Sequence, residues 1–294
     1  MAPKKSVEYK GKILFLHGYT QSASLFYAKT SALRKKLLKL GYKCIYLNGP
    51  YVLTPADLPS NDALSKFSSV TTSEDNDMTY RAWWVKQDST NNKINLEKSI
   101  AAIRDYINHG QIISDPDDHT MNQQSPEEIE QENKLPIVGI IGFSQGAAFG
   151  GLIAHKFHEL FEVDPLKFVI LYSGFKLDTS KQAGNDQYHE HYPQTEEEVI
   201  NSHFKYLHVY GELDTVVEES RAMSLFELTK GSSDLLKHPG GHFVPNSKLY
   251  VERVTNWIQN NEEKKEKEEV EVVEKKEEDD IDSLLDMMDG FGKV

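Results

Sequence analysis

Short, uninterrupted apolar runs recur along the first 210 residues and constrain the fold more than any other feature. Five of them are interpreted as buried strands, because each is too short and too aliphatic for a helix. They lie at 12–17, 42–47, 135–141, 168–172 and 206–210. Apolar residues three or four positions apart predict helices between and after them, over 94–107, 221–228 and 250–258 and in a segment that ends at Gly41. Continuous apolar strands separated by helices predict an α/β fold with a mostly parallel sheet and helices on both faces.

Charge divides the chain into a body and a tail. The 294 residues include 46 acidic and 33 basic ones, a formal net charge of −13. Residues 261–294 contain 14 acidic and 6 basic residues but a single aromatic one, so they cannot bury a core. We therefore expect a folded domain at 1–260 and a disordered acidic tail at 261–294. A polar insertion near 111–134 is expected to be a flexible surface excursion. Residues 176–203 are polar too, either as a loop near the site or as a solvent-facing connection.

Composition excludes several classes of function. The excess of acid disfavours a nucleic-acid partner, because phosphate binding needs a surplus of Lys and Arg. A single cysteine, Cys44, excludes an intramolecular disulfide framework and a zinc site built from a cysteine cluster. No run approaches the ~18 apolar residues of a membrane span, and the basic, polar start lacks the apolar stretch of a secretory signal. We expect a cytoplasmic protein, with the nucleus as a second compartment.

The sharpest functional motif is Gly142-Phe143-Ser144-Gln145-Gly146, a G-x-S-x-G. It follows the predicted strand at 135–141 and precedes an apolar segment, 147–153, that is interpreted as a helix. A serine on such a turn resembles the nucleophile elbow of α/β-hydrolases, where glycines on both sides avoid clashes. The helix N-terminus, beginning with Gln145, would present backbone N–H groups to a developing oxyanion. The alternative is a glycine-rich turn whose serine only caps the helix. A phosphate-binding loop is disfavoured because no lysine follows.

A serine hydroxyl needs a base, and the base needs a carboxylate that holds it. In α/β-hydrolases the chain order is serine, acid, histidine. His242 lies in a glycine-rich loop between a short strand candidate at 235–237 and the last predicted helix. Asp214 follows the strand at 206–210, at the edge where open parallel sheets place ligands. The two residues thus come from successive strand ends. Three other side chains compete for these roles: His238 as the base, and Glu212 and Glu218 as the acid.

An oxyanion hole requires a second N–H, and the end of the first strand offers one at Tyr19. Gly18 before it allows a close approach of the backbone. His17 precedes the serine in the chain, so we expect it to order this loop rather than to act as the base. Candidates to line an acyl pocket for apolar chains are Phe143, Trp83 and Trp84. The alternative for the paired tryptophans is packing in the core.

Together these motifs resemble the FSH family of serine hydrolases, fungal α/β-hydrolases related to a human esterase linked to ovarian cancer. The matching segments are Leu14-Phe15-Leu16-His17-Gly18, Asn48-Gly49-Pro50, Arg81-Ala82-Trp83-Trp84, Gly142-Phe143-Ser144-Gln145-Gly146-Ala147-Ala148, Gly211-Glu212-Leu213-Asp214 and His238-Pro239-Gly240-Gly241-His242-Phe243-Val244-Pro245. The resemblance covers residues 12–260. It implies a triad of Ser144, Asp214 and His242, with oxyanion donors at Gln145 and Tyr19. It also implies hydrolysis of a small acyl ester or thioester through an acyl-enzyme, without a cofactor or a metal.

The acidic tail indicates a second kind of function, binding to a protein partner. Ile281, Leu284, Leu285 and Met288 share one helical face with aspartates at its margins. Such a segment could fold on a basic-rimmed groove, so residues 281–291 are a candidate binding site for a protein partner. The alternative to an enzyme is therefore a catalytically inactive hydrolase-like scaffold that binds through its acidic tail. The simpler interpretation of the tail is a solubilising end, and an intact serine, aspartate and histidine in order favour the enzyme.

Overall fold

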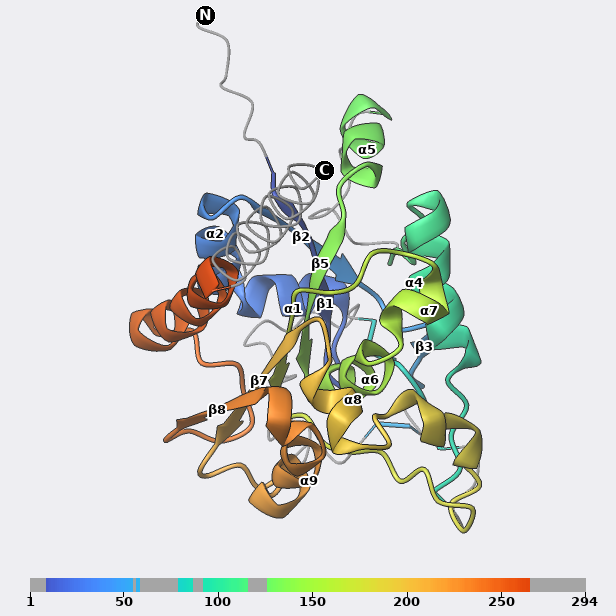
Figure 1. Cartoon of the computed structure of the whole chain (residues 1–294). Helices are drawn as coiled ribbons and strands as arrows, with labels where there is room; N and C mark the ends of the chain where they lie inside the picture. The colour runs from blue at the N-terminus through green and yellow to red at the C-terminus, as the bar shows by residue number, and fades with distance from the viewer. Residues whose placement is uncertain (1–8, 55–56, 59–78, 87–91, 116–125, 265–294) are drawn as a thin grey trace, which may run out of the picture. The chain divides into compact units, whose positions relative to one another are not determined.

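The computed structural model describes residues 9–54, 57–58, 79–86, 92–115 and 126–264 (Figure 1). Contacts divide the chain into two units, residues 1–251 and 252–294. The sheet, the helices that cover it and the candidate site all belong to the first unit. The candidate partner-binding segment at 281–291 lies outside the described residues. Among the helices within the described ranges, none is long and apolar enough to cross a membrane.

A six-stranded sheet forms the centre of the first unit. Its strands are β1 (Gly11–Leu16), β2 (Tyr42–Leu47), β5 (Ile137–Phe143), β6 (Phe168–Tyr172), β7 (Lys205–Gly211) and β8 (Ser233–His238). They are arranged in the order β2-β1-β5-β6-β7-β8, and every neighbouring pair is parallel. Two short strands, β3 (Tyr51–Val52) and β4 (Arg81–Ala82), form a separate antiparallel pair. The predicted parallel α/β sheet is confirmed.

Helices connect the strands and cover the sheet (Figure 1). They are α1 (Ala23–Lys29), α2 (Ser31–Lys39), α4 (Glu97–His109), α5 (Pro126–Asn133), α6 (Gln145–Ala154), α7 (Phe157–Phe161), α8 (Glu196–Ile200), α9 (Glu219–Thr229) and the 3-10 turns η1 (Asp186–His191) and η2 (Lys230–Ser232). A further helix over 248–264 lies mostly in the second unit. The predicted helical segment before Gly41 is two helices, α1 and α2. They meet at Thr30, whose backbone leaves the helical conformation and whose hydroxyl bonds both the Phe26 carbonyl and the Tyr46 hydroxyl.

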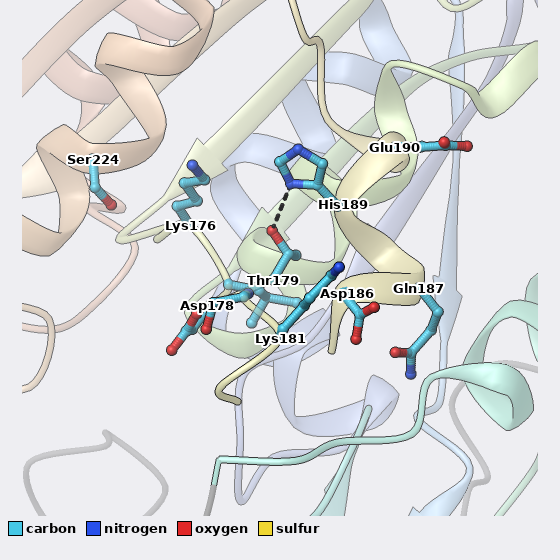
Figure 2. A pocket seen from close by; sticks show the side chains of 11 residues that line it. Lys176, Asp178, Thr179, Lys181, Asp186, Gln187, His189, Glu190 and Ser224 are labelled. Carbon is cyan, nitrogen blue, oxygen red and sulfur yellow. Dashed lines mark hydrogen bonds between the residues drawn. The ribbon is translucent and has the colours of Figure 1, made fainter. Parts of the chain in front are cut away.

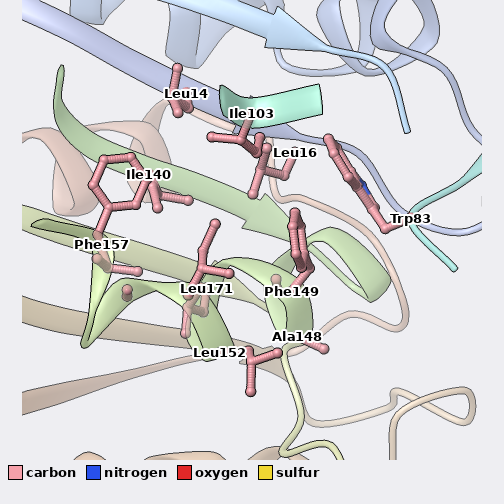
Figure 3. Packing of buried hydrophobic residues seen from close by; sticks show 14 of the residues in the cluster. Leu14, Leu16, Trp83, Ile103, Ile140, Ala148, Phe149, Leu152, Phe157 and Leu171 are labelled. Atoms are coloured by element: carbon pink, nitrogen blue, oxygen red, sulfur yellow. The ribbon is translucent and has the colours of Figure 1, made fainter. Parts of the chain in front are cut away.

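The core lies on both faces of the sheet, as the alternation along β1 shows. Leu14 and Leu16 belong to a large apolar cluster that includes residues of α4 and α6 (Figure 3). Phe15 lies on the opposite face, stacked on Tyr46 at 4.4 Å between ring centroids and close to Phe26 of α1. All six residues of β1 are buried. A strand buried on both faces needs apolar residues at every position, which explains its uninterrupted apolar run.

Most of the described residues of the segment at 111–134 are exposed, as expected for a surface excursion, but parts of it are structured. It contains α5, and two of its acids are buried against the body of the domain. Asp115 forms an ion pair with Arg81 at 2.6 Å, and Glu132 forms one with Lys43 at 2.6 Å. A buried carboxylate requires such a partner because desolvation of an unpaired charge is costly. The partners lie far away in the sequence, so composition alone could not reveal these contacts. Residues 116–125 lie outside the described part of the chain.

Candidate active site

Ser144 occupies a strained turn between β5 and α6. Its backbone has φ 51° and ψ −115°, a left-handed conformation that side chains other than glycine adopt rarely. A Cβ atom on Gly142 would lie 2.6 Å from the Ala147 backbone, and one on Gly146 would lie 2.2 Å from the Leu16 carbonyl oxygen. Only glycine therefore fits on either side of the serine. The turn predicted from G-x-S-x-G is present, and it holds the hydroxyl at the carboxyl end of the sheet.

The structure brings Ser144, His242 and Asp214 together in a hydrogen-bonded series. The Ser144 Oγ lies 3.0 Å from His242 Nε2, and His242 Nδ1 lies 2.8 Å from Asp214 Oδ2. A carboxylate only accepts, so Nδ1 carries the hydrogen and Nε2 accepts from the serine hydroxyl. All three residues are buried. They follow β5, β7 and β8, and the pairing of β7 with β8 explains why Asp214 and His242 meet.

Four donors hold the Asp214 carboxylate. The backbone N–H groups of Val216 and Val217 each donate to Oδ1 at 2.9 Å, while the hydroxyl of Ser173 donates to Oδ2 at 2.9 Å beside His242. Burial acts to raise the pKa of Asp214, but the hydrogen bond and charge of His242 and the two backbone donors outweigh it and lower that pKa. The group therefore stays ionised. Ser173, at φ 47° directly after β6, was not foreseen from the sequence.

The competing residues lie elsewhere. His238 ends β8, and its ring packs against Phe243 and Tyr250, at 5.2 and 5.8 Å between centroids. Its Nδ1 accepts from the Gly240 N–H at 3.3 Å, so it shapes the loop that carries His242. Glu212 and Glu218 are exposed, and Glu218 is the N-cap residue of α9.

The loop after β1 approaches the serine turn. A Cβ atom on Gly18 would lie 3.4 Å from that of Ser144, and Tyr19, Ser144 and Gln145 line one cavity. His17 is fully buried, and burial lowers the pKa of its imidazole to about 4. Its neutral ring accepts from the Gly49 N–H through Nε2 at 2.9 Å and donates from Nδ1 to the Gly18 carbonyl at 2.8 Å. His17 thus orders this loop, in agreement with its position in the sequence.

The cavity at Ser144 has a volume of about 580 Å³. It is lined by Tyr19, Trp84, Lys86, Asn92, Ile94, Ser144, Gln145, Phe175, Lys176, Leu177, Asp178, Asn185, Val216, Val217 and Arg221. Among the predicted pocket residues, only Trp84 is in this set. Trp83 is fully buried, stacks on Phe149 at 5.1 Å and donates to the His17 carbonyl. Phe143 is buried against His242 at 4.8 Å between centroids.

The first part of the segment at 176–203 borders the site, in line with the first of the two alternatives open from the sequence. Four residues of this segment, Lys176, Leu177, Asp178 and Asn185, line the cavity. Asn185 fixes the facing segment by accepting the Ile94 N–H at 2.9 Å and donating to the Asn92 carbonyl at 3.0 Å. Within the described ranges, no group of three or more His, Cys, Asp or Glu side chains is placed to hold a metal ion.

A parallel sheet with a serine on a strained turn between strand β5 and helix α6 defines the α/β-hydrolase class. Within that class, the profile of the family described as "Serine hydrolase (FSH1)" matches residues 7–254, and the chain belongs to this family of serine hydrolases. It is 34% identical over 303 residues to Family of serine hydrolases 3 of Saccharomyces cerevisiae, covering 97% of this chain and 99% of that protein. It is 32% identical to Esterase OVCA2 of Danio rerio, covering 84% and 96% of the two chains. Among solved structures, Zea mays acyl-protein thioesterase 2 superposes with a TM-score of 0.49 at 15% identity over 89% of this chain and 96% of that one.

Proposed function

We propose that the chain hydrolyses carboxylic esters or thioesters with Ser144 as the nucleophile. The observation that carries the proposal is the continuous hydrogen-bonded series from the Ser144 hydroxyl through His242 to Asp214. Membership of the serine hydrolase family supports the same chemistry, and a relative at 32% identity is named an esterase.

In the proposed reaction, His242 Nε2 takes the proton of Ser144 as Oγ attacks the acyl carbonyl carbon. The tetrahedral intermediate collapses when the bond to the alcohol or thiol breaks, and the imidazolium returns the proton to that leaving group. Water then attacks the acyl-enzyme with the same histidine as the base, which releases the carboxylic acid and regenerates the serine. Asp214 keeps the Nδ1 tautomer and stabilises the imidazolium.

The proposed oxyanion donors are the backbone N–H groups of Gln145 and Tyr19. Gln145 is the first residue of α6, and the N–H groups of a helix's first turn have no carbonyl partner within the helix. The positive end of the helix dipole adds to their effect. Each such donor contributes about 3 kcal/mol to the lowering of the barrier in comparable sites.

Labelling with a fluorophosphonate, combined with hydrolysis of 4-nitrophenyl esters, tests the proposal. Wild type should label rapidly, and Ser144→Ala should lose labelling together with up to ~10⁶-fold of its turnover rate. Ser224→Ala is the matched control, since this exposed serine lies in a neighbouring hollow and should change neither readout. An inactive scaffold would show no rapid labelling of wild type, and turnover that survives in Ser144→Ala would remove the assignment.

A further inference from the structure

The described lining of the Ser144 cavity is mainly positive, although the chain as a whole has a negative net charge. Among the described residues, four charged side chains line it: Lys86, Lys176, Arg221 and Asp178. Three of the four are cations, in a chain whose formal net charge is −13. A cleft lined by one sign of charge concentrates ligands of the opposite sign, because the low-dielectric walls focus the field.

Among the described residues, carboxylates neutralise only part of this positive charge. In the described part of the chain, none of the three forms an ion pair at 4.0 Å or less with an acidic side chain. Asp178, the one acid among the described residues that line the cavity, accepts a hydrogen bond from the Ser180 N–H at 3.0 Å. The hydrogen bonds from Ser180 and the charge of Lys176 lower the pKa of Asp178, so it remains an anion. The four side chains therefore leave a cationic excess beside the serine.

Arg221 is the best positioned of the three. It lies in the first turn of α9, and its guanidinium carbon is 4.3 Å from the centroid of the Phe175 ring. Phe175 in turn meets Trp84 edge-on at 6.5 Å, and all three side chains line the cavity. Stacking occupies the face of the guanidinium and leaves its edge N–H groups for an oxyanion, which they can bind in a bidentate manner.

In the described residues, the neighbouring hollow does not share this excess of positive charge. This second hollow, of about 890 Å³, shares Lys176, Leu177 and Asp178 with the first. Its charged lining is Lys176, Lys181, Asp178, Asp186 and Glu190, in which acids outnumber lysine and arginine (Figure 2). A substrate anion is therefore better accommodated on the Arg221 side than in the adjoining space.

We propose that the Ser144 site selects acyl esters or thioesters that carry an oxyanion, a carboxylate or a phosphate, and that Arg221 and Lys176 bind it. This inference rests on the proposed function and adds the class of substrate to it. The apolar wall of Trp84, Ile94 and Val217 contacts the uncharged part of the substrate, and the cations contact the charged part.

Matched pairs of esters test the proposal. For a charge on the acyl side, the pair is 4-nitrophenyl hydrogen suberate and its methyl ester, which share a leaving group. For a charge on the leaving-group side, 4-acetoxybenzoate and 4-acetoxyphenyl phosphate are each compared with methyl 4-acetoxybenzoate. Each kcat/KM is divided by the uncatalysed rate. A preference for the anion of about fivefold or more in either arm supports the proposal and shows which side bears the charge. Equal rates, or a preference for the neutral ester in both arms, overturn it.

Substitutions of Arg221 and Lys176 test whether these two side chains cause the preference for the anionic ester. Arg221→Gln and Lys176→Gln should each reduce the ratio of anionic to neutral kcat/KM about three- to fivefold, and Arg221→Lys, which keeps the charge but loses the bidentate geometry, should give an intermediate ratio. Lys205→Gln, at the opposite end of β7, removes the same charge and should leave the ratio unchanged. Raising the ionic strength from about 0.02 M to about 0.5 M should reduce the ratio too. If turnover depends on Ser144 but the ratio is unchanged in Arg221→Gln and in Lys176→Gln, the inference is wrong and the proposed function is unaffected.

Discussion

The side-chain amide of Gln145 bridges the backbone of Trp83 and Trp84. Its Oε1 accepts the Trp83 N–H at 2.8 Å, and its Nε2 donates to the Trp84 carbonyl at 2.8 Å. The residue that follows the nucleophile thus fixes two neighbouring backbone groups of the cavity wall, while its own N–H belongs to the first turn of α6. The wall that contains Trp84 and the turn that contains Ser144 are therefore linked through one side chain.

Gln145→Ala is expected to keep the backbone N–H beside Ser144 but to leave the Trp83 N–H and the Trp84 carbonyl buried without their partner. Since each of the two unsatisfied buried groups costs about 1–3 kcal/mol, the free energy of unfolding should fall by about 2–6 kcal/mol. KM should rise because Trp84 loses its anchor. Urea denaturation and steady-state kinetics measure the two effects.

Gln145→Glu is the matched control for this link. A carboxylate can accept from the Trp83 N–H but cannot donate to the Trp84 carbonyl, so it preserves only half of the bridge. Equal stability of wild type, Gln145→Ala and Gln145→Glu would show that the bridge contributes nothing to folding.

Ser173→Ala is expected to lower kcat/KM about tenfold. The Ser173 hydroxyl donates to Asp214 Oδ2, the same oxygen that faces His242, and a hydrogen bond to a charged group contributes about 1.5–3 kcal/mol. Val216 and Val217 still hold Oδ1, so we expect a partial loss rather than inactivation. Steady-state kinetics at constant pH checks this, with Ser224→Ala as the control; wild-type kcat/KM in Ser173→Ala would contradict it.

Much of the sheet could be predicted because a strand buried on both faces is apolar at every position. The predicted runs at 42–47 and 168–172 coincide with β2 and β6. The others shift by one or two residues, since an apolar run does not mark where pairing with a neighbour ends. Ser144, Asp214 and His242 could be placed at strand ends by the same logic, and the structure brings them within hydrogen-bond distance of one another.

The remaining site residues depend on contacts that no local pattern encodes. Ser173 also follows an apolar strand, but a serine after a strand is common and its partner, Asp214, lies 41 residues later. Trp83 and Trp84 are adjacent, yet only Trp84 lines the cavity, because successive residues of an extended segment point to opposite sides. Arg221 was foreseen only as part of a helix, since nothing in the sequence relates α9 to the serine turn.

Removal of only one partner of the buried ion pair between Arg81 and Asp115 should strongly destabilise the fold. Arg81 also donates to the Gly49 carbonyl at 3.2 Å, so it joins three segments of the chain. Arg81→Met or Asp115→Asn is expected to lower the free energy of unfolding by about 3–5 kcal/mol, because either change leaves a buried group uncompensated. Chemical denaturation of each single variant and of the double variant measures the coupling between them.

The exposed ion pair between Glu130 and Lys134 is the control for the buried pair of Arg81 and Asp115. Its two side chains are 2.8 Å apart but about 70% exposed (72% and 71%), so Lys134→Ala should change the free energy of unfolding by less than about 0.5 kcal/mol. A loss at Arg81 or Asp115 as small as this one would mean that residues 111–115 are not anchored as the structure describes.

The two tryptophans should respond differently to truncation. Trp83 is fully buried between His17 and Phe149, so Trp83→Ala should lower the free energy of unfolding by about 3–5 kcal/mol. Trp84→Ala should mainly alter the dependence of kcat/KM on acyl length, because its side chain lines the cavity. Rates on acetyl to decanoyl 4-nitrophenyl esters, together with thermal unfolding, separate the two effects; identical chain-length profiles for wild type and Trp84→Ala would count against an acyl-binding role.

Stability should fall with acidification as a result of His17. Burial lowers the pKa of this imidazole from 6.5 to about 4 in the folded chain, with a smaller opposing contribution from the Gly18 carbonyl and a further lowering by Arg81. Between these two values the unfolded chain takes up a proton that the folded chain does not, so unfolding becomes easier as the pH falls. The contribution is fully present above pH 6.5 and is lost progressively down to about pH 4, a difference of about 3 kcal/mol.

His17→Asn removes the titrating group, so its free energy of unfolding should depend less on pH over that range than that of wild type. Burial also lowers the pKa of His208, to about 3. Because wild type and His17→Asn both contain His208, it contributes equally to their free energies of unfolding and does not affect the difference between them. The measurement is urea denaturation at a series of pH values from about 7 to about 4. Curves that run parallel for the two proteins would mean that His17 binds its proton equally well in the folded and unfolded chains, which its complete burial between Gly18 and Gly49 does not allow.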